Sequence, residues 1–338
     1  MSLLDIFKAD AFQLREMTDA INKQPFVPGR IGSMGLFQSN GITTLTAQIE
    51  EKEGILYLVP TRPRGAPGTQ NQMAGRKLRP INTVHLPVDD RLNADEIQGV
   101  REFGTENQLE TIQAKSNEKL QTMRQSIEAT IEHHRMGAIK GIVTDADGSS
   151  VILDLFNTFE ISPYPVVNFD LENTSPVSGY VRNQCHLIQR SMEDALGAAN
   201  IAGVHGFVGK DFMDQLVSHP ETIRAYERWQ DGQALRESFA RRTFAYAGIM
   251  FEEYRGKVGS VQYIEDDEAR FFPLGVPGLF KTVYSPANFL ETVNTVGLPV
   301  YAKSVVDPAD RWVDLLVQSN PLCYCTRPKV LMQGLANS

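Results

Sequence analysis

The sequence predicts an α+β fold in which some segments are too long and too polar to be buried within one subunit. Apolar residues at helical spacing run through residues 105–139, whereas β-branched, alternating runs occupy much of the remaining chain. A third segment, residues 54–88, is basic, rich in proline and glycine, and without apolar periodicity. Because neither the helix nor this basic segment can bury itself in a compact subunit, we expect the chain to act in an assembly.

The composition is that of a folded, acidic protein. The chain has 338 residues, 42% of them hydrophobic, and its 33 basic and 41 acidic residues give a formal net charge of −8. These values exclude wholesale disorder, collagen and coiled-coil rods, and the negative balance argues against a general nucleic-acid binder. Three cysteines cannot form a disulfide framework, so a reducing compartment is the simplest interpretation. We expect neither a signal peptide nor a membrane-spanning helix.

The N-terminal part predicts an arm followed by strands. Apolar residues at helical spacing indicate a short helix near 10–22, which Pro25 ends. The rest of the first 40 residues has little core of its own and is expected to form an extended arm. Residues 42–60 are rich in β-branched side chains and predict strands.

The basic segment, residues 54–88, predicts a two-stranded excursion with a flexible tip. It holds five prolines, four glycines and no acid, and its far end, residues 81–87, is typical of a return strand. Loops of this length inside a compact domain are usually functional or disordered. The positive residues of the segment are Arg62, Arg64, Arg76, Lys77 and Arg79.

A long helix is predicted over about 105–139. Thr105 and Gln108 have capping-box spacing at its start. An apolar stripe runs along one face of this helix, and Ser116 and His134 occupy two positions of its repeat. Polar residues occupy the opposite face. About 30 residues of helix span roughly 45 Å, so this helix must lie against something along its whole length. The stripe consists of Leu109, Ile112, Leu120, Met123, Ile127 and Ile131.

The second half of the chain predicts short strands and helices. Asp147-Gly148 is a strong turn signal and predicts a hairpin over 142–162. The other expected elements are a helix over 181–199, a glycine-rich strand at 201–209, helices ending at Ser218 and starting at Pro220, β structure over 243–264, a solvated acidic loop at 265–268 and one or two strands within 310–331.

Motifs that suggest chemistry have more ordinary explanations. Around Gly209-Lys210, Val204 stands where a phosphate-binding loop has its first glycine, and Asp211 stands where it has Ser or Thr. We therefore expect a strand-to-helix turn. Cys323 and Cys325 point the same way on a predicted strand, but no His pair completes a metal site, which favours buried apolar roles. His133 and His134 are expected to stabilise the negative end of the helix dipole. The residues therefore predict no catalytic, cofactor-binding or metal site.

Five long segments carry a family-like order rather than a short motif. They are LVPTRPRGAPG (58–68), HGFVGKDFMDQLVSHP (205–220), FAYAGIMFEEYRG (244–256), the run 271–303 that begins FFPLGVPGLFKTVYSP, and LLVQSNPLCYCTRPKVLM (315–332). With them the chain resembles, over most of its length, the major capsid protein E family of tailed bacteriophages, the lambda-like major head proteins.

The resemblance implies the Hong Kong 97-type capsid fold, with an N-terminal arm, an extended E-loop, a peripheral domain carrying a long spine helix, and an axial domain. The implied layout is an arm at 1–45, the E-loop at 46–90, the peripheral domain at 91–200 (spine helix about 105–139, hairpin 142–162), the axial domain at 201–304 and a C-terminal return to the peripheral domain at 305–338.

The function implied by the resemblance is that of a structural protein of the virion, not an enzyme. Such a late protein would assemble in the host cytoplasm, as hexamers and pentamers, into an icosahedral shell that encloses packaged double-stranded DNA without sequence-specific binding. The implied partners are other copies of itself, a scaffolding protein and a portal, with a decoration protein left open. No cofactor and no membrane partner are expected.

We predict that the positive residues of the basic segment make intersubunit contacts. Docked on a neighbour's acidic surface, such as Glu106, Glu110 or Glu265, they would gain charge partners that the segment itself lacks. Each surface pair contributes only about 0–1 kcal/mol, so the strength of a shell would come from repetition and apolar contact.

Two other hypotheses stay open on the sequence alone. A metabolic enzyme would need an unusual site built from His205, Asp211 and His219 in the glycine-rich segment. A non-viral encapsulating compartment would share the same fold. Closed shells seen by microscopy would exclude the enzyme, and neighbouring genes for a portal or terminase would separate the two kinds of shell.

Overall fold

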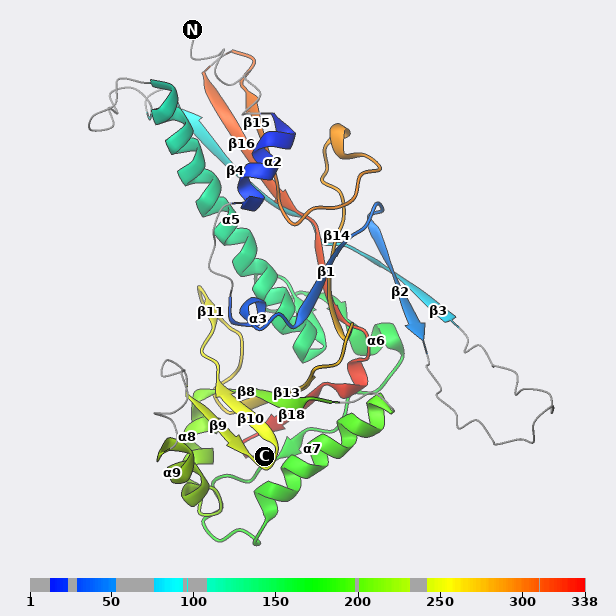
Figure 1. Ribbon diagram of the computed structural model, residues 1–338, viewed down its shortest axis with the longest axis vertical. Coiled ribbons are helices and arrows are strands. Elements are labelled where there is room, and N and C mark those ends of the chain that lie inside the picture. The colour runs from blue at the N-terminus through cyan, green and yellow to red at the C-terminus, as the bar shows by residue number, and fades with distance from the viewer. Residues whose placement is uncertain are drawn as a thin grey trace, which may run out of the picture.

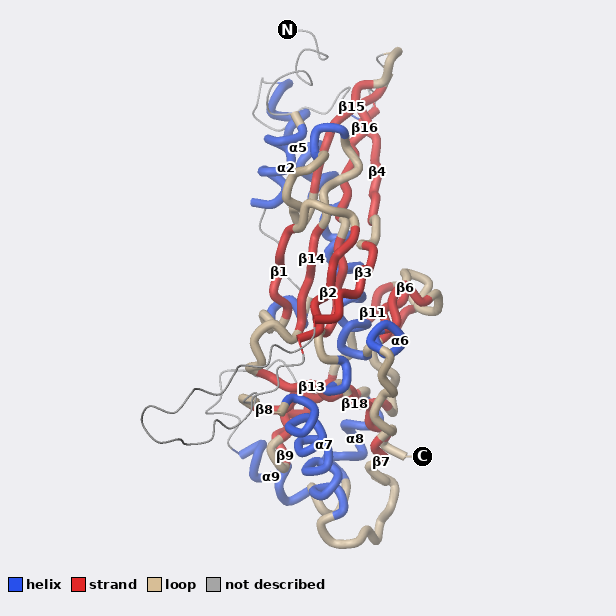
Figure 2. Tube along the Cα trace, turned by 90° about the vertical axis from the view of Figure 1, so that its right-hand side faces the viewer, coloured by secondary structure: helices blue, strands red, loops and turns tan. Residues whose placement is uncertain are grey.

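Helix α5 (Gln108–Lys140) and the sheets beside it form the upper half of an elongated molecule, and a six-stranded sheet with its helices forms the lower half (Figure 1). The structure is a computed structural model that describes residues 13–23, 29–52, 76–93, 96, 108–197, 201–231, 242–309 and 311–337. In the side view, the strands of the upper half run along the long axis, whereas strands of the lower sheet cross it (Figure 2).

Two three-stranded sheets build the upper half. Their strands are β1 (Phe37–Gly41), β4 (Leu86–Asn93), β14 (Phe280–Tyr284), β15 (Tyr301–Val306), β16 (Trp312–Ser319) and β17 (Pro321–Cys325). Strand β16 pairs antiparallel with β15 and β4, and β14 lies between antiparallel β17 and parallel β1. Only Asn320 separates β16 from β17, so one nearly continuous segment serves both sheets. The predicted N-terminal helix is α2 (Leu14–Lys23), which packs on β15.

Helix α5 confirms the long one-sided helix predicted from the sequence. Its inner face contacts β4, β16 and β17. Ser116 and His134 are buried within the apolar stripe, as their place in the period predicts. The capping residue Thr105 lies outside the described residues. The apolar side chains of the stripe that the structure describes, all of them buried, are Leu120, Met123, Ile127 and Ile131.

The lower half is built on a mixed sheet of order β7-β18-β13-β8-β10-β9. Its elements are β7 (Val167–Asn168), α7 (Tyr180–Leu196), β8 (Gly203–Val208), α8 (Lys210–Ser218), α9 (Ile223–Asp231), β9 (Thr243–Tyr246), β10 (Ile249–Glu253), β13 (Glu268–Leu274) and β18 (Met332–Leu335). Phenylalanine rings dominate the core of this half, among them Phe212 packed edge-on against Phe169. Strand β18 inserts between β7 and β13, so residues late in the chain complete the lower sheet.

The glycine-rich segment forms the predicted strand-to-helix turn between β8 and α8. A Cβ atom on Gly209 would lie 2.0 Å from the carbonyl oxygen of Glu265. The close approach of the neighbouring backbone therefore explains this glycine without any bound phosphate.

The return strand of the excursion is placed differently from the prediction. Strand β3 (Arg76–Asn82) is the return strand and pairs antiparallel with β2 (Thr46–Lys52), whereas the sequence favoured residues 81–87. Residues from Leu86 onward belong to β4 and pair with β16 instead. Three of the five positive residues, Arg76, Lys77 and Arg79, thus lie on strand β3.

The predicted hairpin after α5 is shorter than expected. Strands β5 (Ile142–Thr144) and β6 (Val151–Asp154) flank the predicted turn, but helix α6 (Leu155–Phe159) follows at once. The Asp154 carboxylate accepts a hydrogen bond of 3.0 Å from the Asn157 amide and caps this helix. A capping carboxylate therefore ends the strand where the sequence pattern suggested that it continues.

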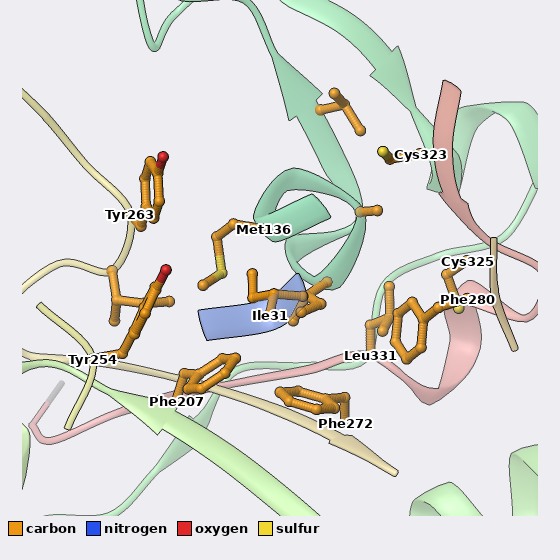
Figure 3. Packing of buried hydrophobic residues seen from close by; sticks show 14 of the residues in the cluster. Ile31, Met136, Phe207, Tyr254, Tyr263, Phe272, Phe280, Cys323, Cys325 and Leu331 are labelled. Carbon is orange, nitrogen blue, oxygen red and sulfur yellow. The ribbon is translucent and has the colours of Figure 1, made fainter. Parts of the chain in front are cut away.

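One continuous apolar core joins the two halves. The four-residue helix α3 (Arg30–Ser33) sits at the junction, where its buried Ile31 lies among Met136 of α5 and the rings of Phe207 and Phe272 from the lower sheet (Figure 3). Both halves thus contribute apolar side chains to the junction, and the N-terminal segment is part of the joint.

Candidate functional site: assembly surfaces and the joint between the halves

The predicted contact residues are distributed along the β2–β3 hairpin. Arg62 and Arg64 lie outside the described residues. Arg76 and Lys77 lie on β3 with backbone partners Lys52 and Glu51, and their side chains are not described. The hairpin points away from the body of the chain (Figure 1).

Arg79 is engaged within its own chain. Its guanidinium donates to the carbonyl oxygens of Thr158 and Phe159, the latter at 3.3 Å, and lies 3.4 Å from the Glu160 carboxylate. The same group stands 5.7 Å from the centre of the Phe159 ring. These carbonyls end helix α6, so Arg79 caps its negative end and anchors the base of the hairpin.

The predicted acidic partners are only partly described. Glu106 lies outside the described residues, and the side chain of Glu110 on α5 does too. Glu265 is exposed and lies on the rim of a cavity of about 330 Å³ at the end of α5. Of the three acids, Glu265 is thus the one that the structure shows at a surface.

The sequence predicted a solvated acidic loop at 265–268, but the structure buries the last of its four acidic residues. Glu268 is buried on β13, where it bonds Arg270 and lies 3.3 Å from the Lys140 ammonium at the end of α5. Burial alone would raise the pKa of Glu268, but the charges of Arg270 and Lys140 outweigh it and lower the pKa. This cluster fastens α5 to the lower sheet.

A second buried cluster, which sequence reasoning missed, holds α3 between the halves. Arg30 donates two hydrogen bonds of 2.6 Å to the Glu252 carboxylate on β10. His205 Nε2 lies 3.2 Å from the same carboxylate. On the other side, the Glu132 carboxylate of α5 accepts from the amides of Ile31 at 2.5 Å and Gly32 at 3.1 Å. One short segment therefore binds both halves through charged groups.

The electrostatics of this cluster favour a charged Glu252. Burial alone would raise the pKa of Glu252, but the nearby His205 ring and the two hydrogen bonds from Arg30 outweigh it and lower the pKa to about 2. No spacing signal could have found the pair, since 222 residues separate Arg30 from Glu252.

The alternative enzyme site is not assembled. His205 is buried beside Phe207 and Phe272, His219 is buried after α8, and Asp211 is half exposed beside Lys210. Within the part of the chain that the structure describes, no hydrogen bond or ion pair joins any two of the three predicted residues, and no group of three or more His, Cys, Asp or Glu could hold a metal. The three side chains therefore lie on separate elements, with the two histidines buried and Asp211 exposed.

The other chemical candidates are buried structural residues. Burial raises the pKa of Cys323 to about 11 and that of Cys325 to about 12, so both thiols stay protonated. Burial also lowers the pKa of His134 to about 4. Because α5 continues to Lys140, a neutral His134 two turns earlier does not stabilise the helix dipole, contrary to the prediction.

The long helix against two sheets, the projecting hairpin and the separate lower sheet define the capsid class of proteins. The chain superposes on a protein assigned as the capsid protein of a prophage in E. coli CFT073 with a TM-score of 0.55 and 12% identity, covering 97% of this chain and 99% of that one. The predicted Hong Kong 97-type α+β fold is thereby confirmed as a fold.

Sequence comparison gives the family. The model of phage major capsid protein E matches residues 13–336, and the chain belongs to this family. It is 27% identical to the major capsid protein of Pseudomonas phage KPP10, over 96% of this chain and 97% of the relative. It is 26% identical to that of Salmonella phage Felix O1, over 97% of both. The protein is therefore a phage major capsid protein, a structural protein and not an enzyme.

Within the described residues, no helix combines the length and the apolarity needed to cross a membrane.

Proposed function

We propose that the protein assembles as hexamers and pentamers into an icosahedral shell that encloses packaged double-stranded DNA. Membership of the major capsid protein family carries this proposal. The projecting β2–β3 hairpin supports it, because a two-stranded hairpin is marginally stable alone and gains stability by docking on another surface.

The proposed layout assigns the upper half to the peripheral domain and the lower half to the axial domain. In this layout α5 is the spine helix and the β2–β3 hairpin is the base of the E-loop. Residues 1–45 form the arm, 46–90 the E-loop, 91–200 and 305–338 the peripheral domain, and 201–304 the axial domain. These ranges follow the sequence, and the two halves argue for moving three of the boundaries. Elements β7, α7 and β18 lie in the lower half and would join the axial domain, whereas β14 and β15 lie in the upper sheets and would join the peripheral domain.

The basic residues of the E-loop are proposed to pair with acids of a neighbouring subunit, with exposed Glu265 as one target. Arg79 already caps helix α6 of its own chain. The proposed intersubunit pairs are therefore formed by the other four basic residues, Arg62, Arg64, Arg76 and Lys77. Such pairs contribute about 0–1 kcal/mol each. Their sum over many copies of the chain provides the stabilisation.

The net charge of −8 suits a container for DNA. A basic inner wall would bind phosphate tightly and hinder both packing and release, whereas an acidic subunit avoids such binding. Assembly in the host cytoplasm with a scaffolding protein and a portal, and a decoration protein on the finished shell, completes the proposal.

Electron microscopy of the purified chain, alone and co-produced with its phage partners, tests the proposal. Closed shells with five-fold and six-fold clusters are expected, and nuclease treatment of particles from infected cells should leave double-stranded DNA protected inside them. Small discrete oligomers under all of these conditions would contradict the proposal.

A further inference from the structure

The loop between β14 and β15, residues 286–300, exposes a group of large apolar side chains. Leu290 is 94% exposed, Val293 61% and Val296 59%, although all three lie within seven residues. The loop stands clear of the strands in Figure 1, where it is drawn in orange above β14. Single exposed apolar residues are ordinary, but a group of them marks an interaction surface.

The loop is held in one conformation by its own hydrogen bonds. The buried Thr292 hydroxyl donates to the carbonyls of Ala287 at 2.7 Å and Phe289 at 2.9 Å, and the Thr295 hydroxyl donates to Thr292 at 2.7 Å. Gly297 donates its amide to the Ile42 carbonyl at 2.9 Å. The exposed side chains are therefore presented by an ordered surface, which lowers the entropy lost on binding.

A groove of about 700 Å³ lies beside these side chains, between the loop and helix α2. Its walls include Leu14, Thr18, Val296, Leu298, Tyr301 and Ser304. Leu290 and Val293 form a projection next to the groove, and the groove has apolar walls of its own. Each chain thus carries both an exposed apolar projection and a groove.

The charges around the groove balance. Arg15 and Asp19 of α2 line one side, and Glu291 and Lys303 form an ion pair of 2.7 Å at the other. The rim of the groove therefore carries two charges of each sign on a chain with a net charge of −8. A strongly charged partner would gain nothing at this rim, whereas a second copy of the same acidic chain can approach here without repulsion.

We infer that the projection of one copy, Leu290 and Val293, inserts into the groove of a second copy between its loop and α2. The contact joins unlike surfaces of two copies, and it closes into a ring when each copy uses its projection and its groove with two different neighbours. One contact covers both the exposed side chains and the apolar groove. This inference rests on the proposed self-assembly of the chain.

Disulfide trapping between two single variants tests the contact. Chains carrying Leu290→Cys are mixed with chains carrying Leu298→Cys, a groove residue, before assembly and then oxidised. The native Cys185, Cys323 and Cys325 are buried and do not compete. The expected result is a heterodimer on a non-reducing gel that a thiol reductant abolishes. Val177→Cys, on an exposed residue of the lower half, is the matched control for Leu290→Cys and should give no such band.

The outcomes separate the contact from the shell itself. Shells that form without a heterodimer band above the Val177→Cys control overturn the contact but leave the proposed assembly intact. Leu290→Cys chains that cross-link mainly to each other also overturn it, because the projections then meet one another. Absence of both shells and cross-links removes the proposed function together with the inference.

Two further measurements exclude other occupants of the groove. Leu290→Asp should weaken association between chains by roughly 10- to 100-fold, as expected for loss of one buried leucine, whereas Val177→Asp should leave it unchanged. Leu298→Cys, at a groove residue that is 40% exposed, should react with maleimide in dilute, unassembled chains. Protection that disappears when residues 2–12 are removed would place the chain's own N-terminal segment in the groove and overturn the proposal.

Discussion

Arg30 and Glu252 form the tightest described link between the N-terminal segment and the lower sheet, with two parallel hydrogen bonds of 2.6 Å. Glu252 is buried, and the Arg30 side chain is 21% exposed. The pair joins a four-residue helix to β10, while Glu132 ties the same helix to α5. The joint between the two halves is therefore charged at its edge and apolar at its centre.

Arg30→Ala should destabilise the chain by about 2–4 kcal/mol, because the substitution leaves the Glu252 carboxylate buried with fewer partners. Urea unfolding of the unassembled chain measures this loss. Arg91→Ala is the matched control, since Arg91 bonds Asp314 at 2.8 Å on an exposed surface and its loss should cost less than about 1 kcal/mol. Equal losses in the two variants would contradict the importance of the joint.

The free energy of unfolding should decrease as the pH is lowered from 6.5 to about 4, because of His134. Burial lowers the pKa of His134 to about 4 in the folded chain, so the unfolded chain binds a proton first as the pH falls below 6.5. Stability is therefore greatest above pH 6.5 and is lost as the pH falls towards 4.

His134→Leu should remove much of this slope, which thermal unfolding at a series of pH values measures. Ser116→Ala, a buried substitution of a non-titrating residue in the same stripe of α5, should keep the slope. An unchanged slope in His134→Leu would assign the pH dependence to other groups.

Charge reversal should separate the two roles of the basic hairpin. Arg76→Glu with Lys77→Glu should lower the yield of assembled shells and leave the unfolding of the unassembled chain nearly unchanged. Arg79→Glu should also destabilise the unassembled chain, by about 1–3 kcal/mol, because it puts a carboxylate against the carbonyls that end α6. Shell yield by sedimentation and unfolding by urea are the measurements. Full yield from the double variant would argue against the intersubunit role.

Gly209→Ala should destabilise the lower half by about 1–3 kcal/mol, because the added Cβ meets the backbone of residues 265–266. Gly203→Ala, at the start of the same strand, has no neighbouring atom within 4 Å of the added Cβ and is the matched control. Thermal unfolding compares the two variants. A tolerated Gly209→Ala would show that the loop moves aside at little cost.

The sequence predicts those parts of the fold whose pattern is local. The α5 stripe is buried by contacts repeated every turn, so its period is visible in the chain itself. The strand-to-helix turn at Gly209 follows in the same way, from the glycine at the start of α8. The capsid fold was predicted from the family resemblance, because local patterns alone do not define how the elements are arranged.

The charged contacts could not be predicted, because their partners are distant in sequence. Glu268 follows three exposed acidic residues, and only the register of β13 turns it inward towards Lys140 and Arg270. Arg79 finds its partners at the end of α6, a helix that the strand-like pattern concealed. Long-range geometry, rather than composition, decides where these charges go.

The late position of strands β16, β17 and β18 has a consequence for synthesis. Residues 312–335 supply the middle strand of one upper sheet, an edge of the other and an inner strand of the lower sheet. Neither half can close its sheet until this stretch has left the ribosome, so the nascent polypeptide cannot fold domain by domain as many proteins do. Association through the finished sheets therefore has to follow the synthesis of residues 312–335.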